Sequence, residues 1–481
     1  MEEESQIAFA LAFRTPHFPI ATGRAYHAWN RDTQTRDGGH SVMRCKRVLQ
    51  LVALGYFSLF DLLTVAFAQT DAQVLFESAG GNVYQILIIE AESGNKSAIG
   101  SGFRVAGSDL IVTNFHVISG ALHKPKKYHI ETLDSAGKRD KAALVDFDVI
   151  HDLAVIRREG EAGGGIVIAA SEVQKGESVF ALGNPFDLGQ TIVPGTFNGL
   201  LERSFYQKLL FSGSLNPGMS GGPALNGSGE LIGVNVATSG NQISFLVPAK
   251  YLTALLDKVN QSTTALAEDQ YRAELARQLD ADQAYKFALL LNLDWPTQKL
   301  GEMQVAGEVS AYFKCWGNTS DDEKLLYRLT ESACTSEDTI FLSDTLQTGA
   351  IDYQYGWTTS ADLGSLRFHR LLSESYARMF TRNPAGEDDV TNYQCRTQFV
   401  ADSNDPDIVY RTVQCVRQYK AYPALYDVLF LSVMLGNHRK SLSSHFALSG
   451  VSRENAEAFT RKFMSLATLS PAPLSLSRGE S

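Results

Sequence analysis

Short runs rich in β-branched and apolar residues fill the chain from residue 83 to residue 248. Gly, Pro, Asn and Asp separate the runs at regular intervals. Such spacing favours antiparallel sandwiches or barrels over βαβ units, which would need long helices between strands. The predicted strands are 83–90, 102–105, 110–114, 128–133, 142–148, 154–157, 178–182, 191–201, 208–212, 231–237 and 243–247.

The pattern changes after Pro248. Residues 249–258 have the amphipathic period of a helix, and a polar linker at 261–264 precedes a long helix predicted over 265–291. The apolar positions of that helix predict one continuous buried stripe. The stripe consists of Leu266, Tyr271, Leu275, Leu279, Tyr285 and 289–291.

Strand-like and helical patterns then alternate. Strands are predicted over 303–315, 336–342 and 350–357, a helix over 363–381, and a hairpin from 393–400 and 408–418, followed by an apolar segment at 426–435. Ser452 is the predicted N-cap of a last helix. We therefore expect an all-β domain over 69–258, an α+β accessory domain over 259–469, and a disordered Pro/Ser-rich tail over 470–481.

The first 68 residues do not fit either domain. Residues 1–42 are polar and aperiodic, which favours a disordered extension or a misplaced start codon. From Met43, basic residues precede an apolar run at 48–68 that ends Ala66-Phe67-Ala68. These features are typical of a secretory signal cleaved before Gln69. An uncleaved membrane anchor and a buried core helix are the alternatives.

Cysteine usage agrees with export. Removal of the signal would leave four cysteines, and an even number in an exported protein favours disulfides. Sequence neighbours suggest pairing Cys315 with Cys334, and Cys395 with Cys415 across the predicted hairpin. A zinc site is the weaker alternative because no C-x-x-C spacing occurs, so we expect no metal and no cofactor.

Composition narrows the function. The chain has 481 residues, of which 44% are hydrophobic and 20% charged, so it is long enough for two or three globular domains. The net charge of −10 argues against nucleic-acid binding, which requires a positive surface. We therefore exclude that class of partner.

The most informative segment is Asn216-Pro217-Gly218-Met219-Ser220-Gly221-Gly222-Pro223. A serine acts as a nucleophile only with a neighbouring base and with N–H donors for the oxyanion that it creates. Gly218 allows the chain to turn so that the N–H groups of Gly218 and Ser220 point to one place. A Gly/Pro-rich surface turn is the alternative, and an upstream His and Asp decide between the two readings.

Both residues stand upstream, His116 at the end of an apolar run and Asp152 just before another. With Ser220 they give the order His, Asp, Ser, and the chain here resembles the trypsin-like serine peptidases, in particular the HtrA/Deg-like bacterial branch. The resemblance covers about residues 80–258. It rests on Gly100-Ser101-Gly102-Phe103, Thr113-Asn114-Phe115-His116-Val117, Asp152-Leu153-Ala154-Val155, Ala181-Leu182-Gly183-Asn184-Pro185-Phe186, the Ser220 segment and Gly233-Val234-Asn235.

The resemblance implies two six-stranded barrels with the active site between them. It implies that Ser220 is the nucleophile, His116 the base and Asp152 the residue that orients His116, with Gly218 and Ser220 as the oxyanion hole. Asp148 would be structural, and His151 would point to the opposite face of its strand.

The resemblance further places Ser214 at the base of the primary substrate pocket, with Val234 and Val236 among the walls. No carboxylate is there to attract Arg or Lys, so cleavage after small or medium apolar residues is expected.

Three features depart from the HtrA-like pattern. Met219 replaces the usual Asn, Ser212-Gly213-Ser214 replaces Thr-Asp-Ala, and no PDZ domain is recognisable after residue 261.

Taken together, the sequence predicts an exported, periplasmic or secreted endopeptidase acting on protein or peptide substrates. It would meet a membrane only if 48–68 stays uncleaved, and its C-terminal domain would bind a partner, position substrate or cover the cleft. The alternative is an inactive binding or adaptor protein built on a peptidase barrel.

Overall fold

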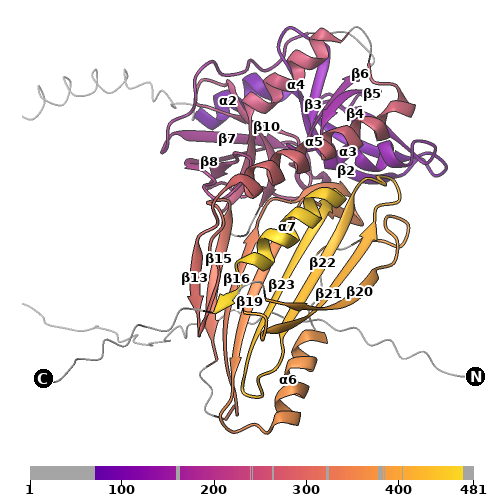
Figure 1. The fold of residues 1–481 in the computed structure, drawn as a ribbon. Helices are drawn as coiled ribbons and strands as arrows, with labels where there is room; N and C mark the ends of the chain where they lie inside the picture. The colour runs from indigo at the N-terminus through magenta and orange to yellow at the C-terminus, as the bar shows by residue number, and fades with distance from the viewer. Residues whose placement is uncertain are drawn as a thin grey trace, which may run out of the picture. The chain divides into compact units, whose positions relative to one another are not determined.

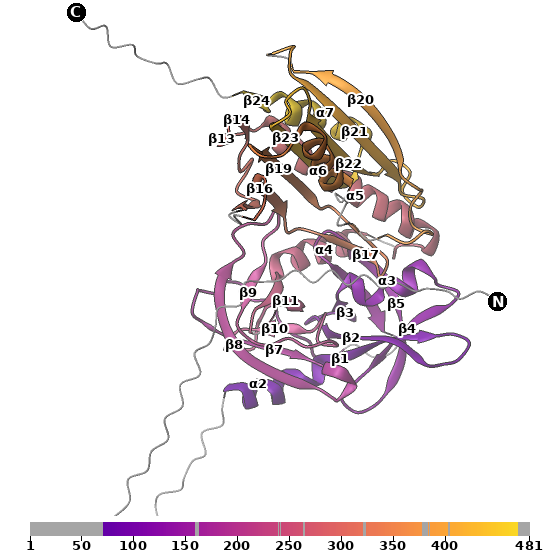
Figure 2. The ribbon, with the colours of Figure 1, turned by 90° about the horizontal axis from the view of Figure 1, so that it is seen from below.

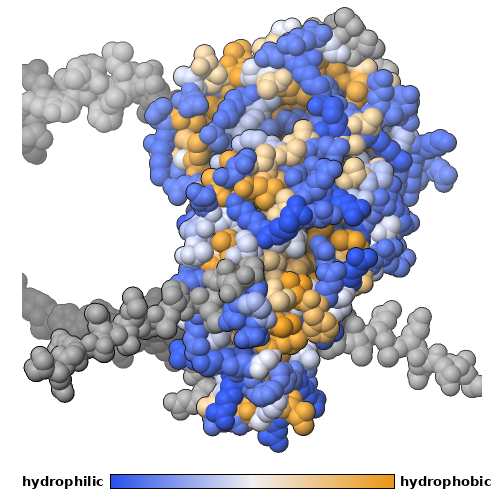
Figure 3. Space-filling model, in the orientation of Figure 1, coloured by the Kyte–Doolittle hydropathy of each residue, from blue (hydrophilic) through white to orange (hydrophobic). Residues whose placement is uncertain are grey.

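The computed structural model describes residues 71–158, 163–238, 240, 242–262, 265–320, 324–377, 383, 385–402 and 405–469. The predicted extension, signal segment and C-terminal tail lie outside the described residues. From Asp71 on, the described chain forms one compact unit. No helix in these ranges is long and apolar enough to span a membrane. Hydrophilic residues are spread between hydrophobic ones over the face in view in Figure 3.

Two closed six-stranded barrels form the first part, as predicted. The first contains β1 (Val83–Glu90), β2 (Lys96–Arg104), β3 (Leu110–Thr113), β4 (Tyr128–Leu133), β5 (Arg139–Asp148) and β6 (Leu153–Arg158), in the order β1-β2-β3-β6-β5-β4. Every neighbouring pair is antiparallel. The helix α2 (Asp71–Ala79) precedes the barrel, and α3 (Phe115–His123) follows β3.

The second barrel has the order β10-β11-β12-β9-β8-β7. Its strands are β7 (Ser178–Gly183), β8 (Thr191–Leu200), β9 (Leu209–Phe211), β10 (Pro223–Leu225), β11 (Leu231–Thr238) and β12 (Ser244–Pro248). The predicted helix after Pro248 is α4 (Ala249–Gln261). Its buried residues, such as Leu252 and Leu255, pack in one core cluster with Val112 of the first barrel and Val234 of the second.

The C-terminal part is α+β, as predicted, and is built on a seven-stranded antiparallel sheet. The sheet order is β15-β16-β19-β23-β22-β21-β20, and α7 (Arg453–Ser465) lies across one face (Figure 1). The strands are β15 (Phe313–Thr319), β16 (Arg328–Ser336), β19 (Ile351–Thr359), β20 (Gln394–Ala401), β21 (Val409–Gln418), β22 (Tyr426–Met434) and β23 (Lys440–Val451). The Ser452 hydroxyl accepts a hydrogen bond from the Asn455 N–H, which confirms the predicted N-cap of α7.

Smaller elements complete this part. A three-stranded sheet contains β13 (Thr297–Leu300), β14 (Met303–Ala306) and β24 (Thr468–Leu469), and β17 (Ile340–Ser343) pairs with β18 (Leu346–Thr348) as a separate hairpin. The helix α6 spans Ser365–Ala377. The predicted strand 303–315 was wrong in extent, because residues 307–312 form a loop between β14 and β15. The predicted strand 336–342 joins the end of β16 to β17.

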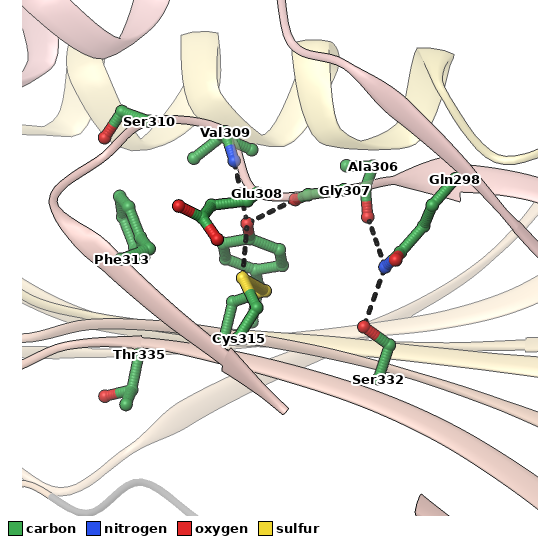
Figure 4. Close-up of a disulfide and its surroundings, with 12 residues drawn as sticks. Gln298, Ala306, Gly307, Glu308, Val309, Ser310, Phe313, Cys315, Ser332 and Thr335 are labelled. Atoms are coloured by element: carbon green, nitrogen blue, oxygen red, sulfur yellow. Dashed lines mark hydrogen bonds between the residues drawn. A yellow bond between two sulfur atoms is a disulfide. The ribbon is translucent and has the colours of Figure 1, made fainter. Parts of the chain in front are cut away.

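Both predicted disulfides are present, Cys315–Cys334 between β15 and β16, and Cys395–Cys415 between β20 and β21. The two cysteines of each disulfide lie 19 or 20 residues apart in the chain. Closing a loop of this length stabilises a fold by about 3 kcal/mol. Figure 4 shows Cys315 below the loop that carries Gly307 and Val309. The Tyr353 hydroxyl donates to the Gly307 carbonyl oxygen at 2.5 Å and accepts from the Val309 N–H at 3.1 Å, which fixes this loop over the sheet.

The long helix α5 (Tyr271–Asn292) does not carry the single buried stripe that the sequence predicts. Leu275 and Leu279 pack in the core of the first barrel, whereas Phe287 and Leu290 pack in the core of the seven-stranded sheet. Tyr285, predicted to be buried, is 54% exposed. The first part of the helix therefore packs in one core and the last part in another.

The predicted boundary between the two domains, at residue 258, stays a prediction.

The second barrel is also tied to the C-terminal part. The Ser204 hydroxyl and the Phe205 N–H donate to the two carboxylate oxygens of Asp338, at 2.5 Å and 2.6 Å. Asp338 itself is 3% exposed. Buried charge must be hydrogen-bonded to be tolerated, and these donors supply that compensation.

Candidate active site

Asp152 occupies a turn directly before β6 and has a left-handed backbone, with φ of 56°. Its carbonyl oxygen accepts hydrogen bonds from the Asn114 side-chain amide at 2.8 Å and from the Phe115 N–H at 3.3 Å. Asp and Asn tolerate this backbone region better than most residues. The turn thereby fixes Asp152 next to the first turn of α3.

His116 lies in that first turn of α3, whereas the sequence places it at the end of an apolar β-run. Its ring nitrogen Nδ1 is 2.7 Å from Asp152 Oδ2, and its backbone N–H donates to Asp152 Oδ1 at 2.9 Å. Because an ionised carboxylate only accepts, Nδ1 carries the proton and Nε2 is left as the acceptor. The two side chains are 27% and 20% exposed, so the pair opens to solvent.

The negative charge of Asp152 changes the pKa of the His116 imidazole. Burial opposes protonation of His116, but the neighbouring carboxylate of Asp152, helped by Asp344, outweighs it and raises the pKa of His116 above its usual value. An imidazole held in this way is a stronger base than a free one.

Ser220 comes from the other barrel, between β9 and β10. Gly221, the next residue, has φ of +85°, and a Cβ there would lie 2.3 Å from the Ser101 carbonyl oxygen and 2.9 Å from the Asn114 N. The Ser101 N–H also donates to the Ser220 carbonyl oxygen at 2.8 Å. The Ser220 segment therefore packs directly on the backbone that leads into His116.

The Ser220 hydroxyl donates its hydrogen bond to the carbonyl oxygen of Val236, at 2.9 Å. A hydroxyl has a single proton, so this proton is directed at β11 and not at His116. Rotation about the Cα–Cβ bond of Ser220 moves it between staggered positions without backbone change.

The loop before Ser220 is held from two sides. The Phe186 N–H donates to the Pro217 carbonyl oxygen at 2.9 Å, and the buried Ser101 hydroxyl donates to the Gly218 carbonyl oxygen at 2.7 Å. In a trans peptide the N–H points opposite to the C=O, so the Gly218 N–H is turned away from Phe186. Gly218 has φ of +97°, and a Cβ would lie 2.5 Å from the Asn184 carbonyl oxygen, so only glycine fits.

The three predicted pocket residues lie in different environments. Ser214 is exposed and Val236 is half-buried. Val234 is 0% exposed and belongs to the core between the barrels and α4, so it lines no open surface.

The neighbouring His151 and Asp148 form a separate pair. His151 Nδ1 is 2.6 Å from Asp148 Oδ2, and Asp148 Oδ1 accepts from the N–H groups of Ile150 and His151. The His151 ring stacks on Tyr251 with a centroid distance of 3.7 Å. Through Tyr251 this pair packs against α4.

Sequence reasoning missed several groups of the site. Ser101 and Asn184, which brace the Ser220 loop, appear in the quoted motifs but without these roles. Phe341 of β17 lies against the His116 ring, with a centroid distance of 5.7 Å. Nothing in the local sequence around Phe341 signals a contact with a residue so distant in the chain.

No cluster of His, Cys, Asp or Glu that could hold a metal ion occurs in the part of the chain that the structure describes.

The family model of the trypsin-like peptidase domain matches residues 100–234. This stretch is a trypsin-like peptidase domain. It contains His116, Asp152 and Ser220, so the peptidase domain supplies all three side chains of the site. The seven-stranded sheet and the β17–β18 hairpin lie outside the matched residues.

Known relatives agree with this assignment. The chain is 32% identical over 185 residues to the serine protease HTRA4 of Homo sapiens, covering 36% of this chain and 36% of that protein. It is 34% identical over 171 residues to a probable periplasmic serine endoprotease, DegP-like, of Chlamydia trachomatis, covering 33% of each chain. The match thus spans about a third of the length of these curated relatives.

Among solved structures, the serine endoprotease from Yersinia pestis is 27% identical, with a TM-score of 0.36, covering 40% of this chain and 68% of that one.

Proposed function

We propose that the protein is a serine endopeptidase that cleaves peptide bonds through Ser220, His116 and Asp152. The observation that carries the proposal is the 2.7 Å contact between His116 Nδ1 and Asp152 Oδ2, with the Ser220 loop packed against Asn114, two residues before His116. Carboxylate, imidazole and hydroxyl in this order are the requirement for activating a serine.

The reaction follows from the hydrogen bonds. Ser220 Oγ rotates from the Val236 carbonyl towards His116 Nε2, transfers its proton there and bonds to the scissile carbonyl carbon. The resulting oxyanion accepts from the N–H groups of Gly218 and Ser220, each donor being worth about 3 kcal/mol at such sites. His116 then protonates the leaving amine as the C–N bond breaks. Water, activated by the same imidazole, hydrolyses the acyl ester.

Asp152 has a positioning role in this scheme. It keeps the proton on Nδ1, so that Nε2 faces the nucleophile, and its negative charge stabilises the imidazolium during the reaction.

The proposed primary pocket starts at Ser214, and its walls include Val236 and the loop before Ser220. Residues 212–219 contain no carboxylate. A pocket without negative charge gives Arg or Lys no ionic partner, so cleavage after small or medium apolar residues is expected. Dominant cleavage of a peptide library after Arg or Lys would contradict this specificity.

Export is part of the proposal. Two disulfides bind strands of the C-terminal part, and disulfides persist in oxidising compartments. The Chlamydia trachomatis relative is named as probably periplasmic. Together with the expected signal before Gln69, these observations support a periplasmic or secreted enzyme.

A fluorophosphonate probe tests the proposal, because it reacts only with an activated serine. The chain from Gln69 onward should be labelled, Ser220→Ala should not, and Ser228→Ala, which changes an exposed loop serine, should be labelled normally. A folded wild-type protein that is neither labelled nor able to cleave casein would support an inactive binding protein instead.

A further inference from the structure

The β17–β18 hairpin of the C-terminal part packs on α3, the helix that carries His116. The hairpin residues Ile340 and Leu342 are 3% and 1% exposed and share a core cluster with Ile118 and Ala121 of α3. Figure 2 shows β17 beside α3. The hairpin is therefore built into the wall of the peptidase domain, although it lies about a hundred residues beyond the matched stretch.

A hydrogen bond fixes the register of this contact. His123 Nε2, at the end of α3, is 2.7 Å from the Leu342 carbonyl oxygen. Burial lowers the pKa of His123, so the imidazole is neutral, and its Nε2–H donates to the carbonyl.

Alternation along β17 decides where Phe341 points. Successive side chains of a strand face opposite sides, so Phe341 faces away from the core that takes Ile340 and Leu342. Its ring meets the ring of His116 edge-on, with an interplanar angle of 68° and a centroid distance of 5.7 Å. Phe341 is half-buried, so part of the residue remains accessible.

The hairpin does not close the site. His116 and Asp152 keep 27% and 20% of their side chains exposed, and Ser220 is half-buried. Nor is the hairpin a free flap, because Leu346 forms an antiparallel bridge with Ala385 and the Thr345 hydroxyl donates to Asp389 at 2.7 Å. A rigid aromatic wall beside an open imidazole is a feature of a binding subsite.

From this arrangement we infer that Phe341 is a specificity-determining residue. It forms an apolar subsite beside His116 for the substrate side chain next to the residue whose carbonyl is attacked. This inference rests on the proposed peptidase function. Because Ser220 Oγ must lie between His116 Nε2 and the scissile carbonyl carbon, a substrate residue next to the one whose carbonyl is attacked must pass along the imidazole. There it meets the ring of Phe341, which favours a branched aliphatic or aromatic side chain over Gly or a charged residue.

The test compares Phe341→Ala and Phe341→Leu with wild type, and Phe399→Ala serves as matched control because it removes a 69% exposed Phe from β20. Each protein is first titrated with the fluorophosphonate, which is small and carries no flanking residue. Then kcat/KM is measured on peptide libraries in which the residues on either side of the scissile residue are varied in turn.

For Phe341→Ala we expect that, per site titrated by the fluorophosphonate, kcat/KM at one flanking position falls about tenfold more for Leu or Phe than for Gly, the size of one or two methylene contacts in an apolar pocket. Phe341→Leu, which keeps an apolar wall, should lose less, and it provides the test if the Ala variant does not fold.

Two failures are distinguishable. If wild type labels and cleaves but neither Phe341 variant changes selectivity at any flanking position, or both change all substrates equally, the inference is wrong and the proposed function stands. A wild type that neither labels nor cleaves overturns the proposed function, and the inference with it.

Discussion

Asp152 holds His116 at two points, accepting from the ring at 2.7 Å through one carboxylate oxygen and from the backbone N–H at 2.9 Å through the other. The two bonds fix both the place and the rotation of the imidazole. Because the carboxylate is bound bidentately, its own rotation is fixed too. A group positioned in this way needs no reorganisation when a substrate binds.

Replacement of Asp152 by Asn tests this relationship. Asn accepts the backbone conformation at φ of 56°, so the fold is retained, but its amide favours the wrong imidazole tautomer. We expect kcat to fall about 10⁴-fold, as in other Ser-His-Asp sites. Asp148→Asn is the matched control, because it breaks the neighbouring pair with His151. If both variants lose the same small amount of activity, Asp152 does not orient a catalytic base.

The pH dependence of activity should follow His116, because only the neutral imidazole accepts the Ser220 proton. Its pKa is raised, so kcat/KM should fall as the pH drops through a value above the ordinary histidine range near 6.5. The negative charge of Asp344 contributes to this rise. In Asp344→Asn the acid limb should therefore move to lower pH.

Added salt should reduce the difference between Asp344→Asn and wild type, since Asp344 is exposed. The control is Asp362→Asn, which removes the same charge at another exposed site of the C-terminal part. A shift of the acid limb to higher pH in Asp344→Asn would contradict the assignment. For stability the sign is opposite: a raised pKa of His116 in the folded state favours folding at pH below about 6.5, and this contribution is lost as the pH rises through the folded-state pKa.

Gly221→Ala should destabilise the fold and displace Ser220. The new Cβ would lie 2.3 Å from the Ser101 carbonyl oxygen, which is backbone and cannot turn aside, and φ of +85° adds strain. We expect the free energy of unfolding in urea to fall by about 3 kcal/mol. Gly107→Ala separates the two causes, because Gly107 has φ of +73° with nothing within 4 Å of the added Cβ. It should cost only about 1 kcal/mol. Equal losses in both variants would show that the close approach to Ser101 is unimportant.

Loss of the Cys395–Cys415 disulfide should loosen one edge of the C-terminal sheet and spare the peptidase site. All residues of β20 are exposed, so the strand has little burial of its own to hold it to β21. In the double Ser variant, amide hydrogens of β20 should exchange faster and stability should drop by about 3 kcal/mol. Fluorophosphonate labelling of Ser220 should be unchanged, and a loss of labelling would mean that this sheet edge supports the site.

Much of the barrel region follows from local pattern, because strand runs and turn residues alternate strictly there. Every barrel strand except β10 is predicted near its position. The strand β10 is missed because it has only three residues and starts with Pro223, the last residue of the Ser220 segment. The helix α3 is missed because its first residues continue the β-branched run of β3. His116 is consequently placed on a strand, although its role in the site is unaffected.

The C-terminal part is harder to predict, because its contacts join residues far apart in the chain. Periodicity indicates that 336–342 contains β-structure, but no local signal separates β16 from β17 or places Phe341 on His116. Likewise, Leu275 and Leu290 both belong to the predicted stripe of α5, yet they pack in different cores. Register and partner choice of this kind are set by tertiary packing, which overrides local preference.

Because α5 packs in two cores, it also couples the unfolding of the two parts of the molecule. Leu275 and Leu279 pack in the core of the first barrel, while Phe287 and Leu290 pack in the core of the seven-stranded sheet. Unfolding of either part would therefore remove packing contacts that α5 makes with the other part. The barrels and the seven-stranded sheet should therefore unfold together as one cooperative unit, seen as a single endotherm in calorimetry. In this protein, thermal loss of the Ser220 site and unfolding of the C-terminal sheet would be one event.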